Sequence, residues 1–208
     1  MPAITQSAVC CSDVFSPSSH FSVEVTGGVT LLRLQSEDGT NRLTRACVQA
    51  LTEAVRDLAE DNASLVITGS SRAFSAGADL REIAALTSPD AYQFSKMGQM
   101  LMDAVASFRV PVIAAITGYC MGGGLDLALA CGQRIASPHA IFGHRGAALG
   151  LITGWGGTQR LPRLIGKGRA LELLIATEKI QALQALRFGL VDSIVVDPVT
   201  EALGRYRR

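Results

Sequence analysis

The chain has 208 residues, and its 19 Lys and Arg against 18 Asp and Glu give a formal net charge of +1. This length suits one domain with a sizeable core, and the charge balance argues against a nucleic-acid-binding protein that works through a large cationic face. The cysteines follow neither disulfide-framework nor zinc-ligand spacing, so we expect no metal site and a reducing, cytoplasmic location; they are Cys10, Cys11, Cys47, Cys120 and Cys131.

The ends of the chain differ in pattern from its middle. Residues 1–20 lack a basic start followed by a continuous apolar stretch, so they indicate a flexible leader rather than a signal peptide. Residues 21–197 carry the apolar periodicity of one core domain. The remaining residues, 198–208, are expected to form a short C-terminal tail, and its last four residues, 205–208, are three arginines and a tyrosine that we expect to be solvated.

Strands and helices are expected to alternate along the core. The expected strands, in chain order, are Phe21–Val25, Gly28–Leu34, Leu65–Thr68, Val110–Thr117, Gln133–Ala136, Ala140–Phe142 and Val191–Val196. The expected helices are one that follows an N-cap at Thr44, then Asp79–Leu86, Asp90–Phe108, Gly122–Cys131, and a helix-rich region from Thr158 to Leu190. Because the strands are continuously apolar, the pattern predicts an α/β fold with a sheet covered on its faces.

The apolar stretch Val110–Cys131 is long enough to span a membrane. However, Pro111 opens it, three consecutive glycines break it, and Asp126 lies in its second half. A charged side chain inside a membrane is costly. We therefore expect a buried strand, a glycine turn and a buried helix, with no membrane as a partner.

Two junctions between a strand and a helix, at residues 72–80 and 118–126, are rich in small residues. Such junctions leave backbone N–H groups unmasked, and the N-terminus of a helix favours negative charge. Two N–H groups that converge on one point would form an oxyanion hole. The alternative is that the glycines only permit turns and close packing. Neither junction matches GxGxxG or GxxxxGK[ST], so nucleotide binding by those motifs is disfavoured.

Four blocks of the sequence together resemble the enoyl-CoA hydratase/isomerase (crotonase) superfamily. They are SRAFSAGADLREI, PVIAAITGYCMGGGLDLALAC, GWGGTQRLPRLIGKGRALELL and GLVDSIV, and they follow the family's order and spacing between about residues 20 and 196. The resemblance implies a crotonase-like spiral of ββα units and a homotrimer or hexamer. It implies an acyl-CoA thioester as ligand, with coenzyme A as part of the substrate and no separate cofactor. Because family members continue with further helices after the last block, it also implies that the C-terminal helical part is truncated.

The resemblance also assigns roles to residues of the two junctions. The oxyanion donors are the backbone N–H groups of Ala78 and Gly123, and Asp126 stands at the position of the first hydratase glutamate, one helical turn from Gly123. The alternative for Asp126 is a carboxylate that only complements the helix dipole. The backbone around Ala76, Ala78 and Leu80 resembles the family's adenine-binding wall, and Arg72 and Arg81 are candidates to meet the coenzyme's phosphates. Asp79 and Tyr119 complete the substrate-binding candidates.

The second hydratase glutamate aligns with Gly146, which has no side chain to act as acid or base. Gly154 likewise stands where dienoyl isomerases of the family hold an aspartate. His144, Thr153 or Tyr119 could replace the missing acid. The alternatives are a satisfied surface histidine, a capping threonine and a tyrosine at the edge of the core.

Taken together, these residues predict an acyl-CoA enzyme of the enoyl-CoA hydratase/isomerase type that stabilises a thioester enolate. Two alternatives stay open. One is a decarboxylase of a malonyl-type thioester, which needs the oxyanion hole but no pair of acids. The other is a catalytically silent acyl-CoA-binding subunit.

Overall fold

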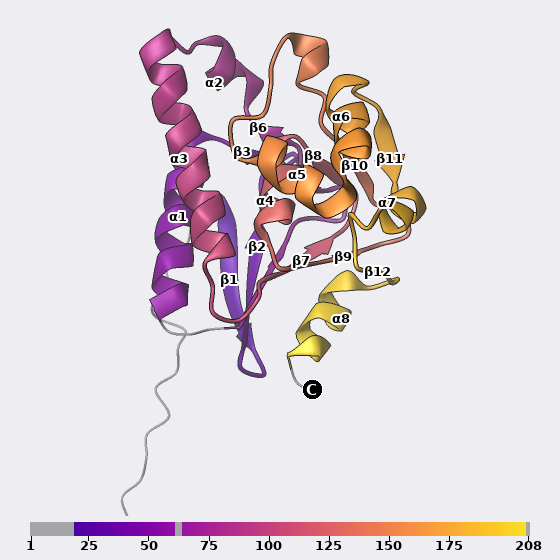
Figure 1. The fold of residues 1–208 in the computed structure, drawn as a ribbon. Helices are drawn as coiled ribbons and strands as arrows, with labels where there is room; N and C mark the ends of the chain where they lie inside the picture. Colours follow the sequence, from indigo (N-terminus) through magenta and orange to yellow (C-terminus); the bar gives the residue numbers. More distant parts are fainter. Residues whose placement is uncertain (1–18, 61–63, 207–208) are drawn as a thin grey trace, which may run out of the picture.

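The computed structural model describes residues 19–60 and 64–206, and its main element is a six-stranded sheet in the order β1-β2-β4-β7-β9-β12 (Figure 1). Strands β1 and β2 form an antiparallel hairpin, and the other neighbours run parallel. The strands are β1 (Phe21–Thr26), β2 (Val29–Leu34), β4 (Ser64–Thr68), β7 (Ile113–Ile116), β9 (Gln133–Ala136) and β12 (Ser193–Ile194). The central strands are buried along nearly their whole length, as continuous apolar runs predict. The predicted α/β class is confirmed.

Two smaller sheets bring the glycine-rich junctions together. One has the order β11-β10-β8-β5, and the other pairs β3 with β6 in parallel. Their strands are β3 (Arg42–Leu43), β5 (Ala73–Ser75), β6 (Gly77–Ala78), β8 (Tyr119–Met121), β10 (Ile141–Gly143) and β11 (Lys179–Gln181). The sequence pattern predicts only β10 among these, because runs of two or three residues are too short to show a clear period. Parallel pairing of β5 with β8 places the first junction beside the second.

The first seven helices follow the predicted order with small shifts in their bounds, and the eighth was not predicted. They are α1 (Arg45–Glu60), α2 (Leu80–Ala84), α3 (Ser88–Ala106), α4 (Gly123–Ala130), α5 (Gly157–Ile165), α6 (Lys167–Ile175), α7 (Ala182–Phe188) and α8 (Pro198–Arg205), with a 3-10 turn at Ala147–Leu149. Thr44 caps α1 as predicted, because its hydroxyl oxygen accepts a hydrogen bond from the backbone N–H of Cys47 at 3.2 Å. Helices α1 and α3 pack against each other (Figure 1).

The apolar stretch Val110–Cys131 contains β7, β8 and α4, so the predicted strand, turn and helix are confirmed. Every residue of helix α4 after its first is buried. Glycine permits this close approach, since a Cβ added at Gly124 would lie 2.6 Å from the Cβ of Ser75. Burial of α4 also places Asp126 inside the protein, where a charge needs partners. Within the described ranges, no helix has both the length and the apolar character needed to cross a membrane.

The expected C-terminal tail at residues 198–208 contains helix α8 in the part that the structure describes. Asp197 caps helix α8 by accepting hydrogen bonds from the N–H groups of Val199 and Thr200, each at 3.1 Å. The helix packs on β4, β7 and β9 with Ala202 buried, and the hydroxyl of Tyr206 donates to the carbonyl of Leu65 at 3.1 Å. The terminal charges suggested solvation, but an apolar face within the helix supplies the packing. Residues 1–18 of the predicted leader, which was expected at residues 1–20, lie outside the described residues.

Three buried cysteines give a test of the packing. Burial raises the pKa of the Cys47 and Cys131 thiols from 9.0 to about 12, and raises that of Cys120 well above its usual value. The neutral thiols therefore stabilise the fold below pH 9.0, and this contribution is lost as the pH rises toward 12. In a background with Cys10→Ser and Cys11→Ser, we expect a thiol reagent at about pH 8 to label native protein slowly and urea-unfolded protein at once. Rapid labelling of the native protein would contradict this packing.

Candidate active site

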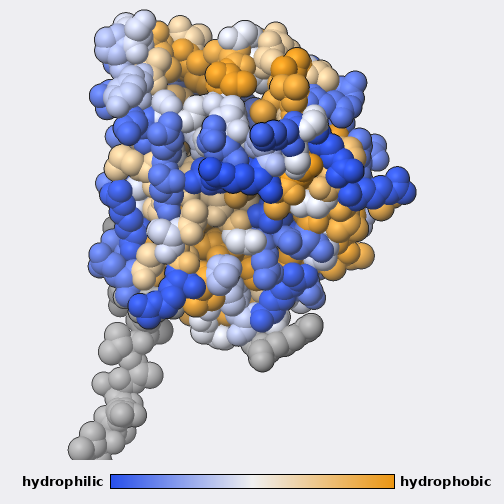
Figure 2. Space-filling model, in the orientation of Figure 1, coloured by the Kyte–Doolittle hydropathy of each residue, from blue (hydrophilic) through white to orange (hydrophobic). Residues whose placement is uncertain are grey.

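A cavity of about 340 Å³ opens between α2, α3, the start of α4 and the segment 144–155. Most of its lining is apolar, and Asp126, His144 and Arg145 are the ionisable side chains among the described residues that line it. Figure 2 shows apolar surface gathered at the end of the molecule where α2 and the 3-10 turn lie. The exposed apolar side chains at this cavity include Leu80 at 54% and Ile152 at 66%.

The two glycine-rich junctions meet at the wall of this cavity, where both Ala78 and Gly123 lie. A Cβ added at Gly77 would lie 2.8 Å from the nitrogen of Gly123, and one added at Gly123 would lie 3.3 Å from the nitrogen of Ala78. The two amide nitrogens are therefore near neighbours. Gly123 is the first residue of α4, so its N–H has no acceptor within the helix, and Gly122 provides no side-chain cap.

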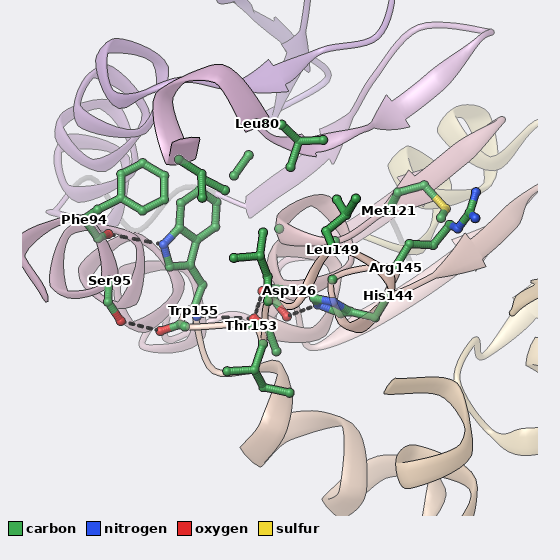
Figure 3. Close-up of a pocket in the computed structure, with 18 of the residues that line it drawn as sticks. Leu80, Phe94, Ser95, Met121, Asp126, His144, Arg145, Leu149, Thr153 and Trp155 are labelled. Carbon is green, nitrogen blue, oxygen red and sulfur yellow. Dashed lines mark hydrogen bonds and ion pairs between the residues drawn. The ribbon is translucent and has the colours of Figure 1, made fainter. Parts of the chain in front are cut away.

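Asp126 lies one turn into α4 and is 1% exposed. Its Oδ1 lies 3.2 Å from Nε2 of His144, and its Oδ2 accepts a hydrogen bond from the hydroxyl of Thr153 (Figure 3). Both of its oxygens thus have a partner, which is the arrangement that a buried carboxylate requires. His144 is itself 5% exposed, so it is not the surface histidine of the alternative interpretation, and Thr153 does more than cap a turn.

The N-terminus of α5 adds a further favourable contact for this carboxylate. A Cβ added at Gly157, the first residue of α5, would lie 2.2 Å from Oδ1 of Asp126. A side chain at position 157 would therefore exclude the carboxylate. The partial positive charge at a helix N-terminus stabilises an anion placed against it.

Trp155 forms the side of the cavity next to Gly123, and the sequence interpretation assigned it no role. It is 3% exposed, its Nε1 donates to the carbonyl of Phe94 at 3.2 Å, and the two rings lie 5.2 Å apart (Figure 3). Glycines enclose the indole, since a Cβ added at Gly98 would lie 2.1 Å from its Nε1 and one at Gly123 would lie 2.5 Å from its Cζ3. A glycine inside a helix costs stability, so Gly98 within the expected helix was the available signal of a close approach.

The remaining candidates divide into two groups. Ala76 and Leu80 line the cavity together with Ala78, whereas Arg72, Asp79, Arg81 and Tyr119 are not among its lining residues. Their substrate-binding roles stay predictions.

The second group makes local contacts instead. Arg72 donates to the carbonyl of Asp38 at 2.8 Å, and Asp79 caps α2 by accepting from the N–H of Arg81 at 2.8 Å. Tyr119 is 40% exposed, and the ammonium of Lys179 lies 5.3 Å from the centre of its ring.

Gly146 and Gly154 both line the cavity. A Cβ added at Gly146 would lie 2.9 Å from the carbonyl oxygen of Leu151, and one at Gly154 would lie 2.8 Å from the hydroxyl oxygen of Ser95. Neither backbone position leaves room for a larger side chain without movement of its neighbours. The alignment of family carboxylates with these two positions stays a prediction.

A family model described as enoyl-CoA hydratase/isomerase matches residues 24–206. The chain belongs to this family. It is 40% identical to a probable mitochondrial enoyl-CoA hydratase of Dictyostelium discoideum over 184 residues, which cover 88% of this chain and 65% of that protein. A crotonyl-CoA hydratase of Syntrophomonas wolfei is 38% identical, and the match covers 80% of this chain and 65% of that protein. The chain therefore spans just under two thirds of the length of these curated relatives.

Solved structures of other proteins share the fold of this enoyl-CoA hydratase/isomerase family member. An enoyl-CoA hydratase from Bacillus anthracis matches with a TM-score of 0.82 and 38% identity, covering 90% of this chain and 74% of that one. DspI from Pseudomonas aeruginosa matches with a TM-score of 0.86 and 36% identity, covering 94% and 75%. The predicted membership of the crotonase superfamily is confirmed.

Proposed function

We propose that this chain binds an acyl-CoA thioester and catalyses a reaction of the enoyl-CoA hydratase/isomerase type through an enolate. The observation that carries the proposal is that two adjacent backbone amides, of Ala78 and Gly123, share one cavity with the paired side chains of Asp126 and His144. Such a cavity offers hydrogen bonds to a carbonyl oxygen and, beside them, groups able to hold a proton.

In this proposal the amides of Ala78 and Gly123 form the oxyanion hole. The thioester oxygen accepts from both N–H groups, and the hydrogen bonds strengthen as negative charge develops on it. The apolar lining supports the arrangement, since a charge interaction is stronger in a water-poor site than in water. Each donor of this kind typically contributes about 10²–10³-fold in rate.

The rest of the cavity suits the remainder of the ligand. Apolar residues on α2 and on the segment 149–152 cover the acyl group, with Phe94 and Trp155 at its end. The open mouth near Ala76 and Leu80 leaves a path for the coenzyme A portion. A homotrimer or hexamer in a cytoplasmic location remains part of the proposal, and exposed leucines and isoleucines on α6 and α7 support subunit contacts.

Hydration of crotonyl-CoA, followed as loss of enoyl absorbance, tests the proposal. Trp155 is the single tryptophan and lies in the cavity wall, so butyryl-CoA, which cannot be hydrated, is expected to change its fluorescence on binding. Turnover together with the fluorescence change supports the proposal. Binding without turnover favours the silent subunit, and release of CO₂ from a malonyl-type thioester favours the decarboxylase.

A further inference from the structure

We propose that His144 is the catalytic acid–base residue of this site and that Asp126 is its positioning residue. The inference rests on the proposed function and assigns the proton transfer within it. It reverses the sequence-based interpretation, in which Asp126 carries the proton and His144 is one of three possible substitutes. The hydrogen bonds that join Asp126, His144, Thr153 and Trp155 support it, together with the burial of Asp126 (1% exposed) and His144 (5% exposed).

The contacts of Asp126 leave it little freedom to act on a substrate. The carboxylate is 1% exposed, Oδ1 faces His144 at 3.2 Å, and Oδ2 accepts from Thr153. Thr153 is fixed in turn, because its hydroxyl oxygen accepts from the backbone N–H of Trp155 at 3.3 Å. A general base must reach the proton that it removes, and both oxygens of Asp126 are already in contact with protein groups.

The same contact fixes the tautomer of His144. In the proposed mechanism Asp126 is ionised, and an ionised carboxylate can only accept hydrogen bonds, so Nε2 of His144 carries the hydrogen and Nδ1 carries the lone pair. Among the described residues, the hydrogen bond of His144 runs through Nε2 alone, and the side chain lines the cavity. Nδ1 is therefore the nitrogen available to water or substrate. Thus a carboxylate orients an imidazole, and the imidazole acts on the substrate.

The reaction step balances with these groups alone. Oxygen of a water molecule bonds to the β-carbon of the enoyl thioester, and a proton of that water passes to Nδ1 of His144. The electron pair of the double bond moves onto the thioester oxygen, which the amides of Ala78 and Gly123 hold. The imidazolium is stabilised by Asp126, and it then returns one proton to the α-carbon as the enolate collapses. The sum is the addition of one water molecule, with no change in oxidation state of the protein.

Position 146 explains why the histidine is needed. Gly146 has no side chain, so it supplies no acid or base in this part of the cavity. His144 lies two residues before it and directly after β10, so its side chain enters the same cavity. The ionisable groups around the imidazole, within the described residues that line the cavity, are Asp126 from α4 and the neighbouring Arg145, which is exposed.

The test measures kcat/KM for crotonyl-CoA as a function of pH. For the unmodified protein we expect activity to fall toward acid pH with the slope of a single proton. His144→Gln is expected to lower kcat/KM by about 10²–10⁴-fold and to remove that slope, while butyryl-CoA binding is kept. Asp126→Asn is expected to cause a similar loss, because its amide can donate to Nε2 and shift the ring hydrogen to Nδ1. The matched control is the exposed His139→Gln, which should behave like the unmodified protein.

A measurement on the unmodified protein does not depend on how the variants fold. In ¹⁵N NMR of the imidazole with butyryl-CoA bound, His144 is expected to be the Nε2–H tautomer and to protonate at Nδ1 over the pH range in which activity falls. An Nδ1–H tautomer would overturn the inference. So would a His144→Gln variant that keeps both its rate and its pH slope, and in that case the proposed function stands. Butyryl-CoA binding with no turnover by the unmodified protein would overturn the proposed function and this inference together.

Discussion

Replacing Gly123 with alanine is expected to lower kcat/KM for crotonyl-CoA by about 10²–10³-fold, the effect of losing one oxyanion donor. The added methyl group would lie 2.5 Å from Cζ3 of Trp155 and 3.3 Å from the nitrogen of Ala78. Trp155 is buried and hydrogen-bonded to Phe94, so the ring cannot simply withdraw. The start of α4 must shift instead, and the N–H of Gly123 shifts with it.

Gly168→Ala is the matched control for this substitution. Gly168 lies in α6, and a Cβ there would meet nothing within 4 Å. The control should keep its full rate and gain about 0.5–1 kcal/mol of stability, because alanine is favoured over glycine inside a helix. A folded Gly123→Ala variant with the unmodified rate would show that the position of this amide does not matter to the reaction.

Replacing Gly98 with alanine is expected to destabilise the fold by about 1–3 kcal/mol, the usual cost of overpacking. The new Cβ would lie 2.1–2.3 Å from the Nε1, Cδ1 and Cε2 atoms of Trp155. The indole would have to move, which breaks its hydrogen bond to the carbonyl of Phe94 and separates the two rings. An unpaired buried donor adds to the cost.

Thermal unfolding followed by circular dichroism measures this effect. For a chain of this size, each kcal/mol lowers Tm by roughly 2–4 °C. Gly204→Ala, in α8 with nothing within 4 Å of the added Cβ, serves as the control and should not lower Tm. An unchanged Tm for Gly98→Ala would contradict the described packing of Trp155.

Much of the fold could be predicted because its strands and helices carry strong local patterns. The strand at Gln133–Ala136 was predicted with its observed bounds, and the strands expected at Phe21–Val25 and Gly28–Leu34 lie within one residue of the bounds of β1 and β2. The short strands β5, β6 and β8 could not be found, since tertiary pairing rather than local preference makes them strands. Helix α8 was missed because a charged chain end was given more weight than its apolar face.

The candidate site was predicted only where a local pattern along the chain relates its residues. Spacing along one helix relates Gly123 to Asp126, and the structure places both at the cavity. No sequence period relates Asp126 to His144 or Thr153, which lie 18 and 27 residues further along the chain. Only the folded arrangement of α4, the end of β10 and the segment before α5 brings them into contact. The burial of His144 follows from that arrangement and from no local signal.

The proposed role of the two backbone amides is tested most directly by ¹⁵N NMR of the labelled protein during titration with butyryl-CoA. If the thioester oxygen lies between Ala78 and Gly123, their amide protons should shift downfield together as the ligand saturates, and by more than that of Gly168. If the ligand saturates while both amide signals stay unmoved, the proposed oxyanion hole is contradicted.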